Sequence, residues 1–64
     1  MEVDSVGARL IVARGKRSRK SVADAVGISV SALAMYETGH RIPRDEIKVK
    51  LADFYKKSVQ HLFY

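Results

Sequence analysis

Positively charged side chains dominate the residues of this chain that could do chemistry. The 64 residues include 12 Lys and Arg against 7 Asp and Glu, which gives a formal net charge of +5 at pH 7. The excess forms two groups, which are Arg14, Lys16, Arg17, Arg19 and Lys20, and then His40, Arg41 and Arg44. Such side chains bind phosphate oxygens, so the pattern favours a nucleic-acid partner; the alternative is a solvated charged surface.

The chain lacks the residue patterns typical of catalysis or metal binding. It has no cysteine, which excludes disulfides and thiolate metal sites. His40 and His61 do not have the spacing of a zinc-binding helix, and Glu37 has no second carboxylate placed for general acid–base work. The serines and glycines form neither a nucleophile elbow nor a phosphate-binding loop. We therefore expect no catalytic residue, no metal, no cofactor and no enzyme activity.

Residues 21–39 have the order of a helix, a sharp turn and a second helix. Val22, Ala23 and Val26 recur at helical spacing, and Gly27 can adopt the left-handed backbone that a tight turn needs. Ile28 is expected to fill the corner with an apolar side chain, and Ser29 to cap the next helix. That helix, over about Val30 to Glu37, would bury Leu33 and Tyr36 and end at Gly39. This is the pattern of a helix-turn-helix.

The flanking segments predict three more helices. A first helix begins after Asp4 or Ser5 and ends near Gly15, and Ser18 opens the second helix. Pro43 prevents continuation of the third helix, so a fourth starts near the acidic pair 45–46, and Ser58 caps a fifth. Their apolar stripes are Val6, Leu10 and Ala13, then Ile47, Leu51, Phe54 and Tyr55, and finally Val59, Leu62 and Phe63. No segment alternates like a strand, so we predict an all-α domain of five helices.

Length and hydropathy set the remaining bounds. Sixty-four residues suffice for one domain, over residues 1–64, which buries only about 60% of its unfolded surface. Hydrophobic residues form 47% of the chain, enough for a core. The apolar runs are far shorter than the roughly 20 residues of a membrane span, and the acidic N-terminus does not resemble a signal peptide. We expect no membrane partner and a cytoplasmic, nucleoid-associated location.

The ordered spacing of these residues resembles the Cro and lambda-repressor-like helix-turn-helix family, also called the xenobiotic-response-element family. The resemblance extends over roughly residues 6–63. It is carried by Gly7, Leu10, Arg14 and Ser18, by the run from Val22 to Gly39, and by Pro43, Ile47, Leu51, Ala52, Ser58, Val59 and Leu62. It implies a compact five-helix DNA-binding domain whose helix-turn-helix consists of the second and third helices.

The chain departs from the family pattern in three respects. The connection after the first helix is about two residues shorter than usual, and Arg17 stands where the family tends to place an apolar anchor. Lys57 likewise replaces an apolar residue before the fifth helix. Lysine is tolerable there if its methylenes cover the core and its ammonium reaches water.

The resemblance also implies which residues would read DNA bases. They are Val30, Ser31, Ala34 and Met35, at the start and one turn along the third helix. None is Arg, Asn or Gln, so readout would depend on the Ser31 hydroxyl, on apolar contact with thymine methyl groups and on DNA shape. The alternative is that Val30 and Met35 belong to the core.

Phosphate contacts are expected on both sides of that helix. The candidates are Lys16, Arg17, Ser18, Arg19, Lys20, Ser29, His40, Arg41 and Arg44. Arg19 stands where the family often has a phosphate-contacting Gln, and the amides at the two serine caps add partial positive charge. By resemblance, Arg14 and Glu37 form a structural ion pair between the first and third helices.

These features favour a sequence-specific regulator of transcription. The resemblance implies a repressor of the phage, plasmid or mobile-element type, which we expect to bind a double-stranded operator as a homodimer. The candidates for the subunit contact are Tyr55, Leu62, Phe63 and Tyr64, of which Leu62 and Phe63 could instead be internal. The chain could be a complete Cro-like protein or the N-terminal part of a longer repressor. A different function also fits the apolar residues of the third helix, namely a protein-interaction module such as an antirepressor or a polymerase-binding factor.

Overall fold

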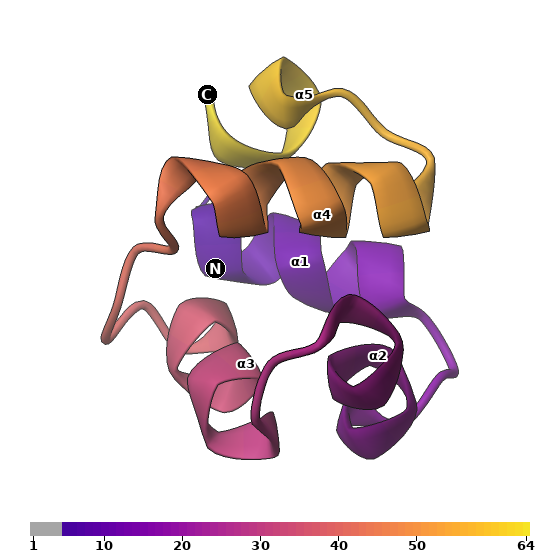
Figure 1. Ribbon diagram of the computed structural model, residues 1–64. Helices are drawn as coiled ribbons and strands as arrows, with labels where there is room; N and C mark the ends of the chain where they lie inside the picture. The colour runs from indigo at the N-terminus through magenta and orange to yellow at the C-terminus, as the bar shows by residue number, and fades with distance from the viewer. Residues whose placement is uncertain (1–4) are drawn as a thin grey trace.

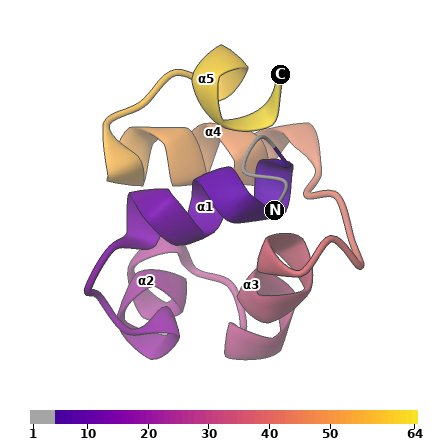
Figure 2. The ribbon, with the colours of Figure 1, turned by 180° about the vertical axis from the view of Figure 1, so that it is seen from behind.

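The computed structural model describes residues 5–64 and contains five helices in that range. They are α1 (Val6–Arg14), α2 (Arg19–Val26), α3 (Val30–Glu37), α4 (Asp45–Tyr55) and α5 (Val59–Phe63). No strand occurs between residues 5 and 64, so the predicted all-α, five-helix fold is confirmed. In Figure 1, and from behind in Figure 2, α2 and α3 lie together at one end, α5 lies at the other, and α1 and α4 lie between.

Serine side chains start four of these helices. The hydroxyls of Ser5, Ser18, Ser29 and Ser58 each accept a hydrogen bond, at 2.9–3.1 Å, from the amide three residues further along. This is the N-cap geometry that satisfies an otherwise unpaired amide. Asp4, the other predicted cap of the first helix, lies outside the described residues. Helix α4 starts without a side-chain cap, but Asp45 and Glu46 occupy its first turn, where negative charge is favourable.

The turn between α2 and α3 forms as predicted. Gly27 has a left-handed backbone (φ 87°), and its amide donates to the carbonyl of Ala23 at 2.8 Å. Ile28 is half-buried and packs against the core. The two helices are thereby held at a fixed angle through an apolar corner.

The core receives side chains from all five helices. Its buried members are Leu10, Val22, Ala23, Val26, Leu33, Tyr36, Leu51, Ala52, Tyr55, Leu62 and Phe63. On α4 the stripe differs slightly from the prediction, because Tyr55 is buried whereas Ile47 and Phe54 are only half-buried. Tyr55 follows Leu51 by four residues and therefore shares its inward face.

The short connection after α1 is closed by Arg17. Its Nε and Nη2 donate to the carbonyls of Arg14 (3.2 Å) and Ala13 (3.0 Å) at the end of α1. Its guanidinium also lies 5.1 Å from the ring centre of Phe54 and 5.5 Å from that of Tyr55. A guanidinium can stack on aromatic rings while it satisfies helix-terminal carbonyls. Arg17 thus takes the place of the apolar anchor that the resemblance led us to expect.

Candidate nucleic-acid interface

The four residues of α3 that the sequence assigned to base reading are all at least partly accessible to solvent. Val30 is 42% exposed, Ser31 is exposed, and Ala34 and Met35 are half-buried. Leu33 and Tyr36 occupy the inward face instead. Within the described chain, Val30 and Met35 are not members of the core cluster, so the interpretation of these two residues as core is wrong. The outer face of α3 is a small, weakly polar surface.

A buried carboxylate fixes the position of α3. The Glu37 side chain is fully buried, and its Oε2 accepts from Arg14 Nε at 2.8 Å, while Oε1 accepts from Arg14 Nη2 at 3.2 Å. The ion pair implied by the resemblance is therefore present. The hydrogen bond with Glu37 is the main cause that raises the pKa of Arg14 above its usual value.

Arg19 is a second partner of Glu37, which the sequence analysis missed. Its Nε donates to Glu37 Oε1 at 2.8 Å, and its side chain remains 38% exposed. The carboxylate thereby joins α3 to both α1 and α2. Because the only nitrogen of Arg19 bonded within residues 5–64 is Nε, the outer edge of its guanidinium remains able to meet a phosphate. We refer to Arg14, Arg19 and Glu37 as the Glu37 triad. The sequence did not indicate it, because the family usually has a Gln at the position of Arg19.

Close approach of backbones places α1 against the end of α3. A Cβ atom on Gly7 would overlap the carbonyl oxygen of Glu37. Only glycine allows this approach, which brings the Arg14 guanidinium within reach of the Glu37 carboxylate. Gly7 thus positions the triad although it carries no side chain.

Three of the predicted phosphate-contacting residues come together at one surface hollow. Ser29, Arg41 and Arg44 line one surface hollow of about 510 Å³ beside the start of α3, together with Ile42. The capping oxygens of Ser18 and Ser29 each accept from their own helix, which leaves the hydroxyl hydrogens available for donation to a phosphate. Ile42, 67% exposed in this hollow, was not among the predicted site residues.

The other candidate phosphate contacts differ in their surroundings. Lys16 is exposed, and Lys20 makes an exposed ion pair with Asp24 at 2.9 Å. Such a pair is weak enough to exchange for a phosphate. The Nδ1 atom of His40 lies 2.8 Å from Thr38 Oγ1 at the end of α3. Arg17 is directed to α1 and to the rings of α4, so we remove it from the candidate phosphate contacts.

The structure also bears on the predicted subunit contacts. Tyr55, Leu62 and Phe63 are at most 7% exposed and belong to the core, which removes them as subunit contacts and leaves Tyr64, at 70% exposure. Within residues 5–64, no group of three His, Cys, Asp or Glu side chains is placed to hold a metal ion. No helix in the same range is long and apolar enough to cross a bilayer.

Comparison with known proteins places most of the chain in one protein family. A family model described as helix-turn-helix matches residues 9–62. That match begins within α1 and ends within α5, so it includes the buried Glu37 triad and the exposed face of α3. Searches of curated proteins and of solved structures found no match to this chain.

Proposed function

This chain belongs to the Cro and lambda-repressor-like helix-turn-helix family of DNA-binding regulators, and we propose that it represses transcription by binding a specific operator as a homodimer. The observation that supports this is that cationic residues lie at both ends of α3. Arg19 of α2 binds Glu37 at the end of α3, and the backbone amides of His40 and Arg41 donate to the carbonyl of Met35. Arg41 and Arg44 also line the hollow beside Ser29, at the start of α3. In a symmetric dimer two such helices would enter successive major grooves about 34 Å apart.

The residues of α3 imply an unusual mode of base reading. Val30, Ala34 and Met35 offer methyl and methylene groups to thymine methyls, and Ser31 offers one hydroxyl. Specificity would then depend on A·T-rich positions and on DNA shape, while affinity would come from phosphate contacts. Among these contacts, Arg41 and Arg44 flank the start of α3.

The test is binding of a labelled mixed-sequence duplex, measured by fluorescence anisotropy over a range of salt concentrations. Arg44→Ala should weaken binding and reduce the slope of log affinity against log salt by about one unit, because one phosphate contact is lost. Lys50→Ala removes the same charge from an exposed position on α4, remote from α3 in sequence, and should leave affinity nearly unchanged. Equal losses for both variants would show that net charge alone attracts the DNA.

Base reading is tested separately by selecting duplexes from a random pool. Met35→Ala should change the preferred bases at one position while nonspecific affinity stays the same. An unchanged preference would remove Met35 from the reading set. Failure of the wild-type chain to bind any duplex would instead favour the protein-interaction alternative.

A further inference from the structure

A groove lies between α1, the end of α4 and α5, and the DNA-binding proposal does not use it. Its volume is about 400 Å³, and its lining includes Arg9, Val12, Tyr55, Lys57 and His61. Among the described residues, none that line it comes from α2 or α3. In Figure 2, α1 lies between α5 above and the helix-turn-helix below. An occupant of the groove would therefore leave the outer face of α3 free.

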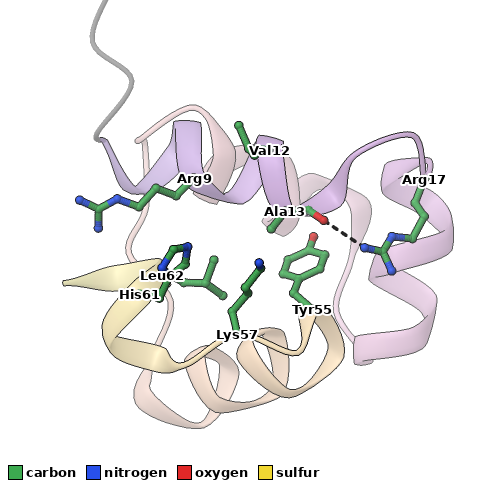
Figure 3. A pocket seen from close by; sticks show the side chains of 8 residues that line it. All are labelled: Arg9, Val12, Ala13, Arg17, Tyr55, Lys57, His61 and Leu62. Carbon is green, nitrogen blue, oxygen red and sulfur yellow. Dashed lines mark hydrogen bonds between the residues drawn. The ribbon is translucent and has the colours of Figure 1, made fainter.

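The groove is strongly cationic. Arg9, Arg17 and Lys57 line it, as does His61, and no carboxylate is among the described lining residues. Figure 3 shows Arg9 and Arg17 at opposite ends, with Lys57 between them. Positive side chains along a groove with partly apolar walls concentrate the electrostatic potential there. The complementary occupant carries several negative charges in a row.

An apolar surface adjoins this cationic groove. Val12, which forms part of the groove wall, is 79% exposed, and its neighbour Ile11 is 43% exposed. Ala8, one turn before them, is only half-buried. The outer side of α1 is thus apolar from Ala8 to Val12, which is more than one turn, although the chain is rich in charge. A small anion in the groove would leave Ile11 uncovered.

A buried hydroxyl at the groove has no partner. The Oη atom of Tyr55 is inaccessible to water and forms no hydrogen bond within residues 5–64. Figure 3 shows it directed toward α1, between Lys57 and Arg17. A buried donor without an acceptor is unfavourable. An occupant of the groove could reach this hydroxyl only if the side chains that cover it moved.

We propose that this groove and the adjoining face of α1 dock an acidic amphipathic helix of a partner protein. Its apolar stripe would pack on Val12 and Ile11. Its carboxylates would meet Arg9 and Lys57. This is the helix-in-groove mode of recognition, in which apolar anchors supply affinity and charge selects the partner. The docked helix would bind together with DNA.

The test uses a synthetic peptide probe with leucines along one helical face and glutamates on both flanks. Amide shifts of the labelled protein are followed as the peptide is added. We expect changes at residues 9–13 and 57–62, and none at residues 30–35. A scrambled peptide of the same composition keeps the charge and loses the apolar stripe, so it should bind about tenfold more weakly. Equal binding of the two peptides would overturn the proposal.

Two matched variants distinguish binding of the peptide at the groove from a general effect of net charge. Val12→Glu places a negative charge on the docking face and should weaken the peptide about tenfold. Val49→Glu makes the same change at an exposed valine of α4, 49% exposed, and should leave peptide binding within about twofold. Both sites are on the surface, so both variants should fold. The proposal is wrong if the two variants weaken binding equally.

Competition experiments distinguish the other possible occupants. Adding a mixed-sequence duplex should leave the peptide bound, and displacement by DNA would mean that the peptide merely imitates a phosphate backbone at α3. Sodium benzoate, a small organic acid, should not reproduce the shifts at residues 11 and 12. Saturation of the groove by benzoate, with no binding of the peptide, would assign the site to small anions and overturn a protein partner.

Discussion

At the scale of single residues, Glu37 has the greatest structural effect. It is the only charged side chain buried in the described chain, and guanidiniums from two different segments bind it. Removing one member of a buried ionic group leaves the other charges poorly compensated. The resemblance implied one ion pair, whereas the folded chain forms a triad, because the start of α2 lies beside the end of α3.

Glu37→Gln should destabilise the protein by about 2 kcal/mol, at the lower side of losses for buried pairs because both arginines are partly exposed. Urea denaturation followed by circular dichroism measures the change. Asp24→Asn removes the exposed pair with Lys20 and should change stability by less than about 0.5 kcal/mol. Similar effects of the two substitutions would contradict a special role for Glu37.

Lys56 is the one non-glycine residue with a positive φ between residues 5 and 64, at 57°. It ends α4 in the left-handed conformation, which side chains with a Cβ adopt at a cost. Lys56→Gly should therefore raise the free energy of unfolding by about 0.5–1 kcal/mol. Lys57→Gly, at the next position, has no such strain to relieve and should give no gain. A higher melting temperature for the second variant would exclude this explanation.

At the scale of elements, the contact of α1 with α3 decides where the recognition helix lies. Gly7 permits the two backbones to approach, and Arg14 then reaches Glu37 from the same helix. The spacing of Gly7 and Arg14, two turns apart, places both on the inward side of α1. One helix thus supplies both the close backbone contact and the charge that hold α3.

The substitution Gly7→Ala shows whether helix propensity or the close contact of α1 with α3 has the larger effect on stability. Propensity alone predicts a gain of about 1 kcal/mol, because glycine is unfavourable inside a helix. The overlap of the new methyl group with the Glu37 carbonyl predicts the opposite, a loss of about 1–3 kcal/mol. Thermal unfolding of the variant shows which effect is larger. A more stable variant would mean that α1 and α3 lie further apart.

At the scale of the whole molecule, the DNA-binding face and the groove of the proposed partner helix lie on different sides. The helix-turn-helix carries the family's DNA-binding face, while α1 and α5 enclose the cationic groove on another side. The core beneath is shared, and Tyr55 extends from it to the groove. A chain of 64 residues can thereby present two separate surfaces.

The buried phenol of Tyr55 makes stability depend on alkaline pH. Burial is the main cause that raises its pKa above the usual value of 10.0. From about pH 10 upward the unfolded tyrosine has lost its proton while the folded one keeps it, so the folded state binds more protons and stability falls as pH rises. Tyr55→Phe should show a shallower fall in denaturation midpoint between neutral and strongly alkaline pH.

A residual decline should remain in that variant. The hydrogen bond from Lys48 Nζ to the Tyr64 hydroxyl, 2.9 Å long, is the main cause that raises the pKa of Lys48. The stabilisation that this hydrogen bond gives to the folded state is present below the pKa of Lys48 in the unfolded chain. It is lost as the pH rises through the higher pKa of Lys48 in the folded chain. Identical pH profiles for the variant and the wild type would show that Tyr55 is not desolvated.

Local residue patterns determined the helices and their ends. Serine caps, the left-handed glycines and the apolar periodicities act over a few residues, so the sequence predicted the five helices, the turn at Gly27 and the inward residues Leu33 and Tyr36. The phosphate and base contacts stay predictions, since they depend on DNA.

Only the tertiary structure decided which distant groups meet. Arg19 meets Glu37 because the start of α2 lies beside the end of α3, and Arg17 lies over the rings of Phe54 and Tyr55. The groove beside Val12 likewise exists only once α1, α4 and α5 are packed. Sequence periodicity reports which face of a helix is buried, but contacts between helices depend on the angles at which those faces pack.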